Sequence, residues 1–152
     1  MKIEELINYG IPLEIINRLI NKGYNRLFPP QIFAIEKGVL NFKNFILASP
    51  TASGKTLVAL LASVKHLIKG GKAVYICPLR ALASEKYEEF KEILGDSFKV
   101  ALSIGDYDSS DPWLENFEYI VTTYEKADSL IRHNSKWLNN VSIFIIDEIH
   151  LL

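Results

Sequence analysis

Between residues 45 and 146 the sequence alternates between short apolar runs and longer stretches with helical spacing, and this alternation restricts the fold more than any other feature. The apolar runs occupy residues 45–48, 73–77, 100–104, 119–122 and 143–146. Helical patterns lie between them, at residues 54–69, 81–94 and 125–132. Runs that are apolar on both faces are typical of parallel strands covered by helices on each side. The pattern therefore predicts a doubly wound α/β domain with a mainly parallel sheet.

Two further helical segments precede the first apolar run. One begins near Pro12 and ends near Gly23, and the other follows the pair Pro29-Pro30 and runs to a polar turn at residues 41–44. We therefore expect residues 1–44 to form N-terminal helices and residues 45–152 to form the α/β domain.

Charge and cysteine content exclude some classes of protein. The formal net charge is −1, although residues 1–75 hold ten Lys or Arg against four Glu and residues 76–152 hold seven against fourteen acids. The net balance therefore predicts neither a nucleic-acid binder nor a membrane-surface protein. The single cysteine, Cys77, cannot form an internal disulfide, which favours a reducing location, cytoplasmic or nucleoid-associated. The most apolar stretch, residues 57–64, is far shorter than the roughly 20 residues of a membrane helix, so we expect no membrane partner.

The first apolar run leads into a segment suited to phosphate. Residues 49–56 read Ser49-Pro50-Thr51-Ala52-Ser53-Gly54-Lys55-Thr56, and an apolar helical pattern follows them. Backbone N–H groups, the positive end of a helix dipole and a mobile lysine together bind phosphate oxygens, and a Thr hydroxyl binds Mg²⁺. The alternative is a simple helix cap without a ligand.

The last apolar run ends in acids. Asp147 and Glu148 follow residues 143–146 directly. Ligands of open α/β sheets bind at the carboxyl ends of the strands, where one acid can hold Mg²⁺ and its neighbour can polarise a water molecule. A polar turn or helix cap is the alternative interpretation.

The chain has one glutamine, Gln31, directly after the Pro29-Pro30 pair. Its side-chain amide offers a donor and an acceptor on one plane, which complements the edge of adenine and mismatches guanine. The alternative is an ordinary solvent-facing residue in the first turn of a helix.

Read in order, these segments resemble the motifs of superfamily-two helicases. The motifs are the proline-containing segment that ends in Gln31, the loop at residues 49–56, Pro-Leu-Arg-Ala-Leu-Ala at 78–83 and Asp-Glu-Ile-His at 147–150. Gly-Asp-Tyr-Asp at 105–108, Thr-Tyr-Glu-Lys at 123–126 and Asp-Ser-Leu at 128–130 are similar to the superkiller-like branch, and most of all to its archaeal DNA-repair, fork-processing helicases.

The resemblance implies a first RecA-like P-loop domain, truncated after the acidic strand, that uses ATP and Mg²⁺. It places Gln31 at adenine, Ser49, Pro50, Thr51, Ala52, Ser53, Gly54, Lys55 and Thr56 at the phosphates, and Thr56 with Asp147 at the metal. It makes Glu148 the catalytic base, acting with Lys55 and Asp147, and has His150 couple the nucleotide site to the nucleic acid. It also places Arg80, Thr123 and Lys126 at the backbone of one strand; Tyr124 departs from the small hydroxyl residue more usual there. Taken alone, Arg80 is better interpreted as a helix cap and Lys126 as a solvated side chain.

The resemblance also predicts partners. Single-stranded or forked DNA is expected more than RNA, together with a second RecA-like domain that this chain lacks. The isolated chain should therefore bind ATP without unwinding DNA, and its exposed sheet edge should favour self-association. Other interpretations are an RNA helicase of the same branch, a P-loop small-molecule kinase, a non-catalytic ATP-dependent interaction module and a translocase subunit of a nuclease or restriction system.

Overall fold

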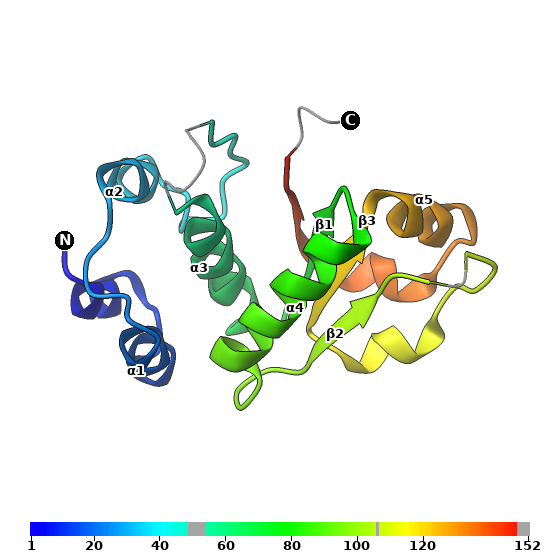
Figure 1. Ribbon diagram of the computed structural model, residues 1–152, viewed down its shortest axis with the longest axis horizontal. Coiled ribbons are helices and arrows are strands. Elements are labelled where there is room, and N and C mark those ends of the chain that lie inside the picture. Colours follow the sequence, from blue (N-terminus) through cyan, green and yellow to red (C-terminus); the bar gives the residue numbers. More distant parts are fainter. Residues whose placement is uncertain (49–53, 106, 149–152) are drawn as a thin grey trace. The chain divides into compact units, whose positions relative to one another are not determined.

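The computed structural model describes residues 1–48, 54–105 and 107–148, and its contacts divide the chain into two compact units, residues 1–68 and 69–152 (Figure 1). The division groups the helix after the phosphate loop with the N-terminal helices, whereas the sequence suggests a boundary after residue 44. No helix within the described ranges is long and apolar enough to cross a membrane.

The first unit is helical. It contains a 3-10 helix, Ile3–Tyr9, followed by α1 (Leu13–Asn21), α2 (Pro29–Glu36) and α3 (Lys55–Leu67). Pro12 is the N-cap of α1 and Pro29 is the first residue of α2, positions that suit the fixed φ of proline. The Lys65 ammonium donates to the carbonyl oxygen of Tyr9 over 2.7 Å, which joins α3 to the 3-10 helix.

Residues 45–48 do not form the predicted strand. They carry no regular secondary structure, and the Ile46 side chain is 84% exposed. A strand requires hydrogen bonds from a neighbouring strand, and among the described residues no strand pairs with this segment. The prediction is therefore wrong for this structure, because an apolar run does not by itself supply a pairing partner.

The second unit contains the sheet. Its elements are β1 (Lys72–Cys77), α4 (Arg80–Leu94), β2 (Val100–Ser103), β3 (Tyr119–Thr123), α5 (Tyr124–Arg132) and β4 (Val141–Ile146), with 3-10 helices at Pro112–Asn116 and Lys136–Asn140. The strand order is β2-β3-β1-β4, and every pairing is parallel. The four later apolar runs are thus confirmed as strands of a parallel sheet. The carboxyl ends of the four strands lie at the same end of the sheet, and this is where α/β sheets bind ligands.

Helices cover both faces of the central strands (Figure 1). On the α4 face, the Phe90 ring lies 5.0 Å from the Tyr75 ring and 5.1 Å from the Tyr119 ring, measured between centroids. On the α5 face, Val74 joins a buried cluster with Leu130 of α5. Successive side chains of β1 point to opposite faces, so the strand is buried on both sides.

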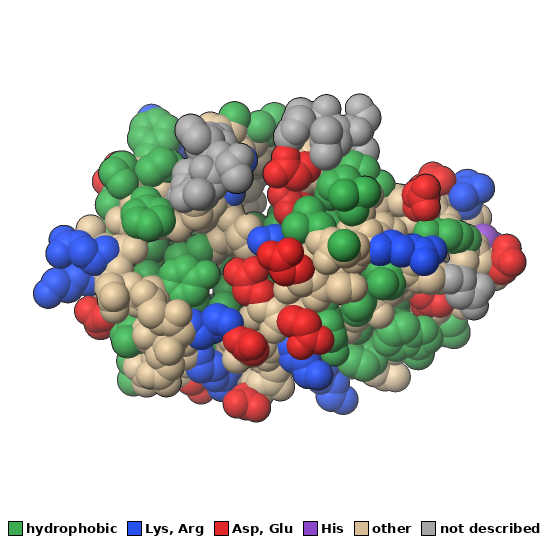
Figure 2. Space-filling view, viewed as in Figure 1, with side chains coloured by type: hydrophobic (Ala, Val, Ile, Leu, Met, Phe, Trp, Pro, Cys, Tyr) green, Lys and Arg blue, Asp and Glu red, His purple; other side chains and the backbone are tan. Residues whose placement is uncertain are grey.

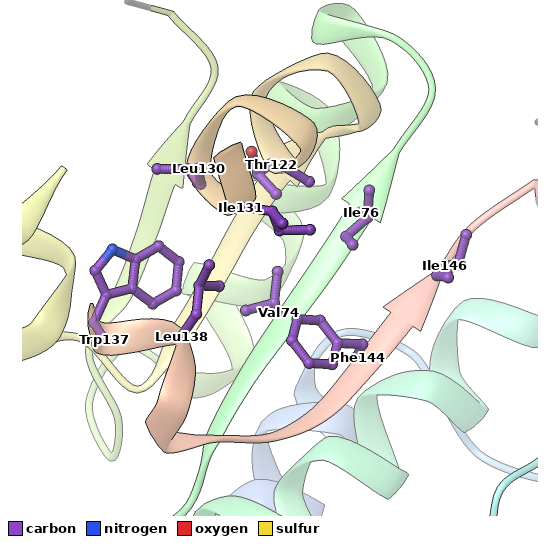
Figure 3. A pocket seen from close by; sticks show the side chains of 10 residues that line it. Val74, Ile76, Thr122, Leu130, Ile131, Trp137, Leu138, Phe144 and Ile146 are labelled. Carbon is purple, nitrogen blue, oxygen red and sulfur yellow. The ribbon is translucent and has the colours of Figure 1, made fainter. Parts of the chain in front are cut away.

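The outer strand β4 is less completely covered. Phe144 and Ile146 lie beside Val74 and Ile76 in the sheet register, but their side chains are 51% and 42% exposed. They line an apolar groove of about 350 Å³ (Figure 3). Trp137 lies at the opposite end of this groove in Figure 3. The groove lies beside α5, whose main contacts in the sheet are with β3 and β1.

Candidate nucleotide site and nucleic-acid interface

The described part of the phosphate loop is its junction with α3. Gly54 is the N-cap of α3 and has φ 84°, a left-handed conformation that favours glycine. A Cβ atom at this position would overlap Nε2 of Gln31, so the close approach also requires glycine. Lys55 and Thr56 occupy the first turn of α3 and are half-buried. Ser49, Pro50, Thr51, Ala52 and Ser53, all expected at the phosphates, lie outside the described residues.

Gln31 contacts this junction, but its side-chain amide is not accessible to adenine in this conformation. Its side chain is 3% exposed, and both ends of its amide are used. Oε1 accepts a hydrogen bond from the backbone N–H of Phe28 at 2.6 Å, and Nε2 donates to the carbonyl oxygen of Gly54 at 3.0 Å. Gln31 therefore caps α2 and ties it to the phosphate loop. The amide keeps one further donor and one further acceptor position, but contact with adenine would require the buried side chain to become accessible.

The second candidate segment is the turn after β4, which belongs to the second unit. The Asp147 N–H donates to the carbonyl oxygen of Ile76 at 2.9 Å, which continues the β1–β4 pairing by one residue. The Tyr75 hydroxyl of β1 donates to Oδ2 of Asp147 at 2.8 Å. Burial and the neighbouring Asp147 carboxylate raise the pKa of Tyr75, so this hydroxyl stays a donor.

Glu148 ends the described chain with φ 54°, a left-handed conformation that is uncommon for a residue with a side chain. The Tyr124 hydroxyl reaches the carbonyl oxygens of both Asp147 and Glu148, the latter at 2.9 Å. Burial and the nearby Asp147 raise the pKa of Tyr124, which keeps this group protonated as well. His150 lies outside the described residues.

Of the three residues expected at a nucleic-acid backbone, only Arg80 is exposed. It is the first residue of α4, and its Nη2 donates to the Tyr107 hydroxyl at 3.1 Å, which in turn donates to the Glu125 carboxylate at 3.0 Å. The hydrogen bond with Tyr107 raises the pKa of Arg80. Basic and acidic side chains are intermixed around α4 in Figure 2, so a guanidinium here does not belong to a uniformly basic patch.

Lys126 and Thr123 are buried and differ from that expectation. Lys126 is completely buried, and its ammonium lies 3.1 Å from Oδ2 of Asp111. The Thr123 hydroxyl accepts the backbone N–H of Lys126 at 3.2 Å and so caps α5. In this conformation neither side chain can reach a phosphate. Both instead stabilise the start of α5.

Asp111 is the centre of this buried cluster. Its Oδ2 also accepts the Ser103 hydroxyl at 2.7 Å. Burial alone would raise the pKa of Asp111, but hydrogen bonds from Ser103 and Ser109 and the ion pair with Lys126 outweigh it, and the net pKa is lowered. The carboxylate is therefore charged and paired, which fixes the loop before the second 3-10 helix against α5.

A parallel α/β sheet with Asp-Glu at a strand end, together with Gly-Lys-Thr at a helix start, defines the class of RecA-like nucleotide-binding domains. The model of the DEAD/DEAH box helicase family matches residues 28–152. The chain belongs to this family.

Curated relatives cover the whole chain. The ATP-dependent DNA helicase Hel308 of Pyrococcus horikoshii is 50% identical over 153 residues, which span 100% of this chain and 21% of the relative. Hel308 of Thermococcus kodakarensis is 50% identical over 157 residues, with 100% of this chain and 13% of the relative covered. The chain thus spans about a fifth, or less, of the length of these relatives.

Solved structures agree in fold. A hypothetical ATP-dependent RNA helicase from Sulfolobus tokodaii superposes with a TM-score of 0.74 at 25% identity, covering 91% of this chain and 41% of that chain. The DUF1998 helicase MrfA bound to DNA and AMPPNP gives a TM-score of 0.75 at 26% identity, covering 93% of this chain and 21% of that chain.

Proposed function

We propose that the chain is the ATP-binding part of the first motor domain of an ATP-dependent DNA helicase, acting on single-stranded or forked DNA in repair or recombination at replication forks. The observation that carries the proposal is a single chain with Gly-Lys-Thr at the start of α3 and Asp-Glu at the end of a parallel strand, half identical to a relative named as a DNA helicase. The protein would act in the cytoplasm or in association with the nucleoid.

The described residues suit Mg²⁺ and ATP. Lys55 and Thr56 lie in the first turn of α3, where backbone N–H groups and the helix dipole favour phosphate oxygens. The Thr56 hydroxyl and the Asp147 carboxylate are the oxygen ligands that Mg²⁺ prefers. A carboxylate has about four acceptor positions, so the bond from Tyr75 leaves capacity for a metal. Bound ATP would supply the γ-phosphate, and Glu148 would take the proton of the attacking water.

A nucleotide titration tests this proposal. We expect a fluorescent ATP analogue with Mg²⁺ to bind the 152-residue chain saturably, to be competed by ATP and not by GTP, and to lose binding in Lys55→Ala. Gln31→Ala should weaken binding through the loop, since Gln31 holds Gly54. The matched control is Lys37→Ala, which removes an exposed lysine of the same unit. Binding that survives Lys55→Ala would contradict the proposal.

The nucleic-acid partner is tested separately. DNA is favoured by the names of the curated relatives and by the DNA bound to MrfA, whereas the Sulfolobus tokodaii protein is named as an RNA helicase. We expect a single-stranded DNA oligonucleotide to bind more tightly than RNA of the same sequence. Arg80→Ala should weaken this binding, and Arg132→Ala, an exposed arginine of α5, should not. A preference for RNA would favour the RNA-helicase alternative.

Catalysis would need the second RecA-like domain, because arginines from that domain stabilise the transferred phosphoryl group. We expect the isolated chain to hydrolyse ATP very slowly and to unwind no DNA. If Glu148→Gln leaves ATP-dependent partner binding unchanged and the protein shows no hydrolysis, the chain is a non-catalytic ATP-dependent module instead.

Self-association through β4 is part of the proposal. β4 pairs on one side only, with β1, among the strands that the structure describes. Its exposed Phe144 and Ile146 add apolar surface beside the edge, and such edges pair with other chains. Size-exclusion chromatography should therefore give a concentration-dependent mass that Phe144→Lys lowers. A constant monomeric mass would refute this part.

A further inference from the structure

We infer that Tyr124 is a positioning residue that links the start of α5 to the Asp147–Glu148 turn, so that nucleic acid bound at Arg80 of α4 alters the position of the two acids. The inference rests on the proposed function, because it requires nucleic acid to bind at Arg80 and Asp147 and Glu148 to act on ATP.

The start of α5 is a rigid support for Tyr124. The residue follows Thr123, which is 3% exposed and caps the helix by accepting the Lys126 N–H. Lys126 is fully buried against Asp111. Thr123 and Lys126 therefore hold the backbone at the β3–α5 junction from which the Tyr124 side chain extends.

The acidic turn depends on outside contacts. Glu148 has φ 54°, which for a residue with a Cβ atom costs free energy that surrounding contacts must offset. The Tyr124 hydroxyl is within hydrogen-bond reach of the carbonyl oxygens of Asp147 and Glu148, and the Tyr75 hydroxyl donates to the Asp147 carboxylate. The two tyrosines therefore have separate roles. Tyr75 orients the carboxylate of Asp147, and Tyr124 holds the backbone that carries both acids.

The same junction reaches the surface. Glu125, next to Tyr124, accepts a hydrogen bond from the Tyr107 hydroxyl. That hydroxyl in turn accepts a hydrogen bond from the guanidinium of Arg80. A phosphate bound by Arg80 would compete with Tyr107 for the guanidinium and so release Tyr107 and Glu125. A continuous series of contacts thus leads from the one exposed member of the proposed strand-binding set to the acids.

The length of the tyrosine side chain allows its hydroxyl to span this gap. β1 lies between β3 and β4, so the side chain must cross the end of one strand to reach the next but one. A serine or threonine at position 124 would keep a hydroxyl but would not reach the Asp147 and Glu148 carbonyl oxygens. Phenylalanine would keep the ring and lose only the donor, which makes it the sharper variant.

Hydrogen–deuterium exchange of the 152-residue chain tests the inference. In Tyr124→Phe, amide exchange in the turn at residues 147–148 should become about fivefold faster, the effect of losing one ordinary hydrogen bond. Tyr87→Phe, at a half-buried tyrosine of α4 that contacts Lys91, is the matched control and should change nothing there. Unchanged exchange in Tyr124→Phe would overturn the positioning role.

Addition of single-stranded DNA tests the link itself. In the wild type, DNA should change exchange at residues 147–148, and Tyr124→Phe should abolish that response while the DNA affinity stays within about twofold, because the variant leaves Arg80 in place. DNA that binds without any response at these residues would overturn the inference and leave the proposed function standing. If no DNA binds at all, the proposed function fails, and the inference falls with it. Near-ultraviolet circular dichroism establishes that Tyr124→Phe is folded.

Discussion

Replacement of Lys126 separates two roles that a lysine at this position could have. A lysine that contacts nucleic acid costs little stability when it is removed, whereas a buried ion-pair partner costs a great deal. The Lys126 side chain is 0% exposed and its partner Asp111 is 10% exposed, with 3.1 Å between ammonium and carboxylate. Removing one member of such a pair leaves a charge buried without compensation. We therefore expect Lys126→Ala to lower the free energy of unfolding by about 3–5 kcal/mol.

The chain offers an internal control for this value. Arg132 and Asp128 form an ion pair on α5 with the same 3.1 Å separation, but their side chains are 68% and 66% exposed. Solvent screens that pair, so Arg132→Ala should cost no more than about 0.5 kcal/mol. Adding Asp111→Asn to Lys126→Ala should restore about 1–3 kcal/mol, because the double variant no longer buries a lone carboxylate.

The choice of assay follows directly from the sequence. Both tryptophans, Trp113 and Trp137, lie in the second unit, so their fluorescence during urea titration reports the unfolding of that unit. The lowered pKa of Asp111 sets the direction of the pH dependence. The contribution of Asp111 to the free energy of unfolding is present above pH 3.8 and is lost as the pH falls through the folded-state pKa. Lys126→Ala should weaken this acid dependence. A loss below about 1 kcal/mol for Lys126→Ala, together with weaker DNA binding, would refute the burial argument.

Two further predictions concern the loop and the pH dependence. Gly54→Ala should abolish nucleotide binding and lower the thermal midpoint, since φ is 84° and the new Cβ would meet Gln31; an unchanged midpoint in a thermal melt would contradict this close approach. Burial raises the pKa of the Cys77 thiol from 9.0 to about 12, so stability from its neutral form is complete below pH 9 and declines as the pH rises from there. The native chain should therefore resist thiol reagents at about pH 8 until urea unfolds it, and rapid labelling without urea would show that the thiol is accessible.

The sequence predicts the later strands and helices well because their signals are local. Four apolar runs alternate with helical patterns, and each of them pairs with a neighbouring strand in the sheet. These runs are residues 73–77, 100–104, 119–122 and 143–146. The run at 45–48 has the same local signal, but pairing is a non-local property, and within the described ranges this segment has no strand partner. Apolarity predicted burial there, and Ile46 is exposed.

Side-chain partners were less accessible to sequence reasoning. Lys126 has the sequence context of a surface lysine, and nothing near it predicts an ion pair with Asp111. Gln31 was expected at adenine, and nothing in its sequence context predicts its hydrogen bond to Gly54, which lies 23 positions away. Tyr124 carried a signal, because it departs from the small residue expected there, but its role needs the proximity of two strand ends that only the fold supplies.

The strand order has a consequence for the sequence of folding events. Among the strands that the structure describes, β4 pairs only with β1, and its register joins Lys72 to Val141, residues far apart along the chain. Contacts of such long range close a large loop and form late, while β1 and β3 already share a core with Phe90. An edge element that docks last is also the first to open in the native state. The acids at the end of β4 therefore exist as a site only while this last strand is in place, so local opening of β4 would switch the site off well before the rest of the unit unfolds.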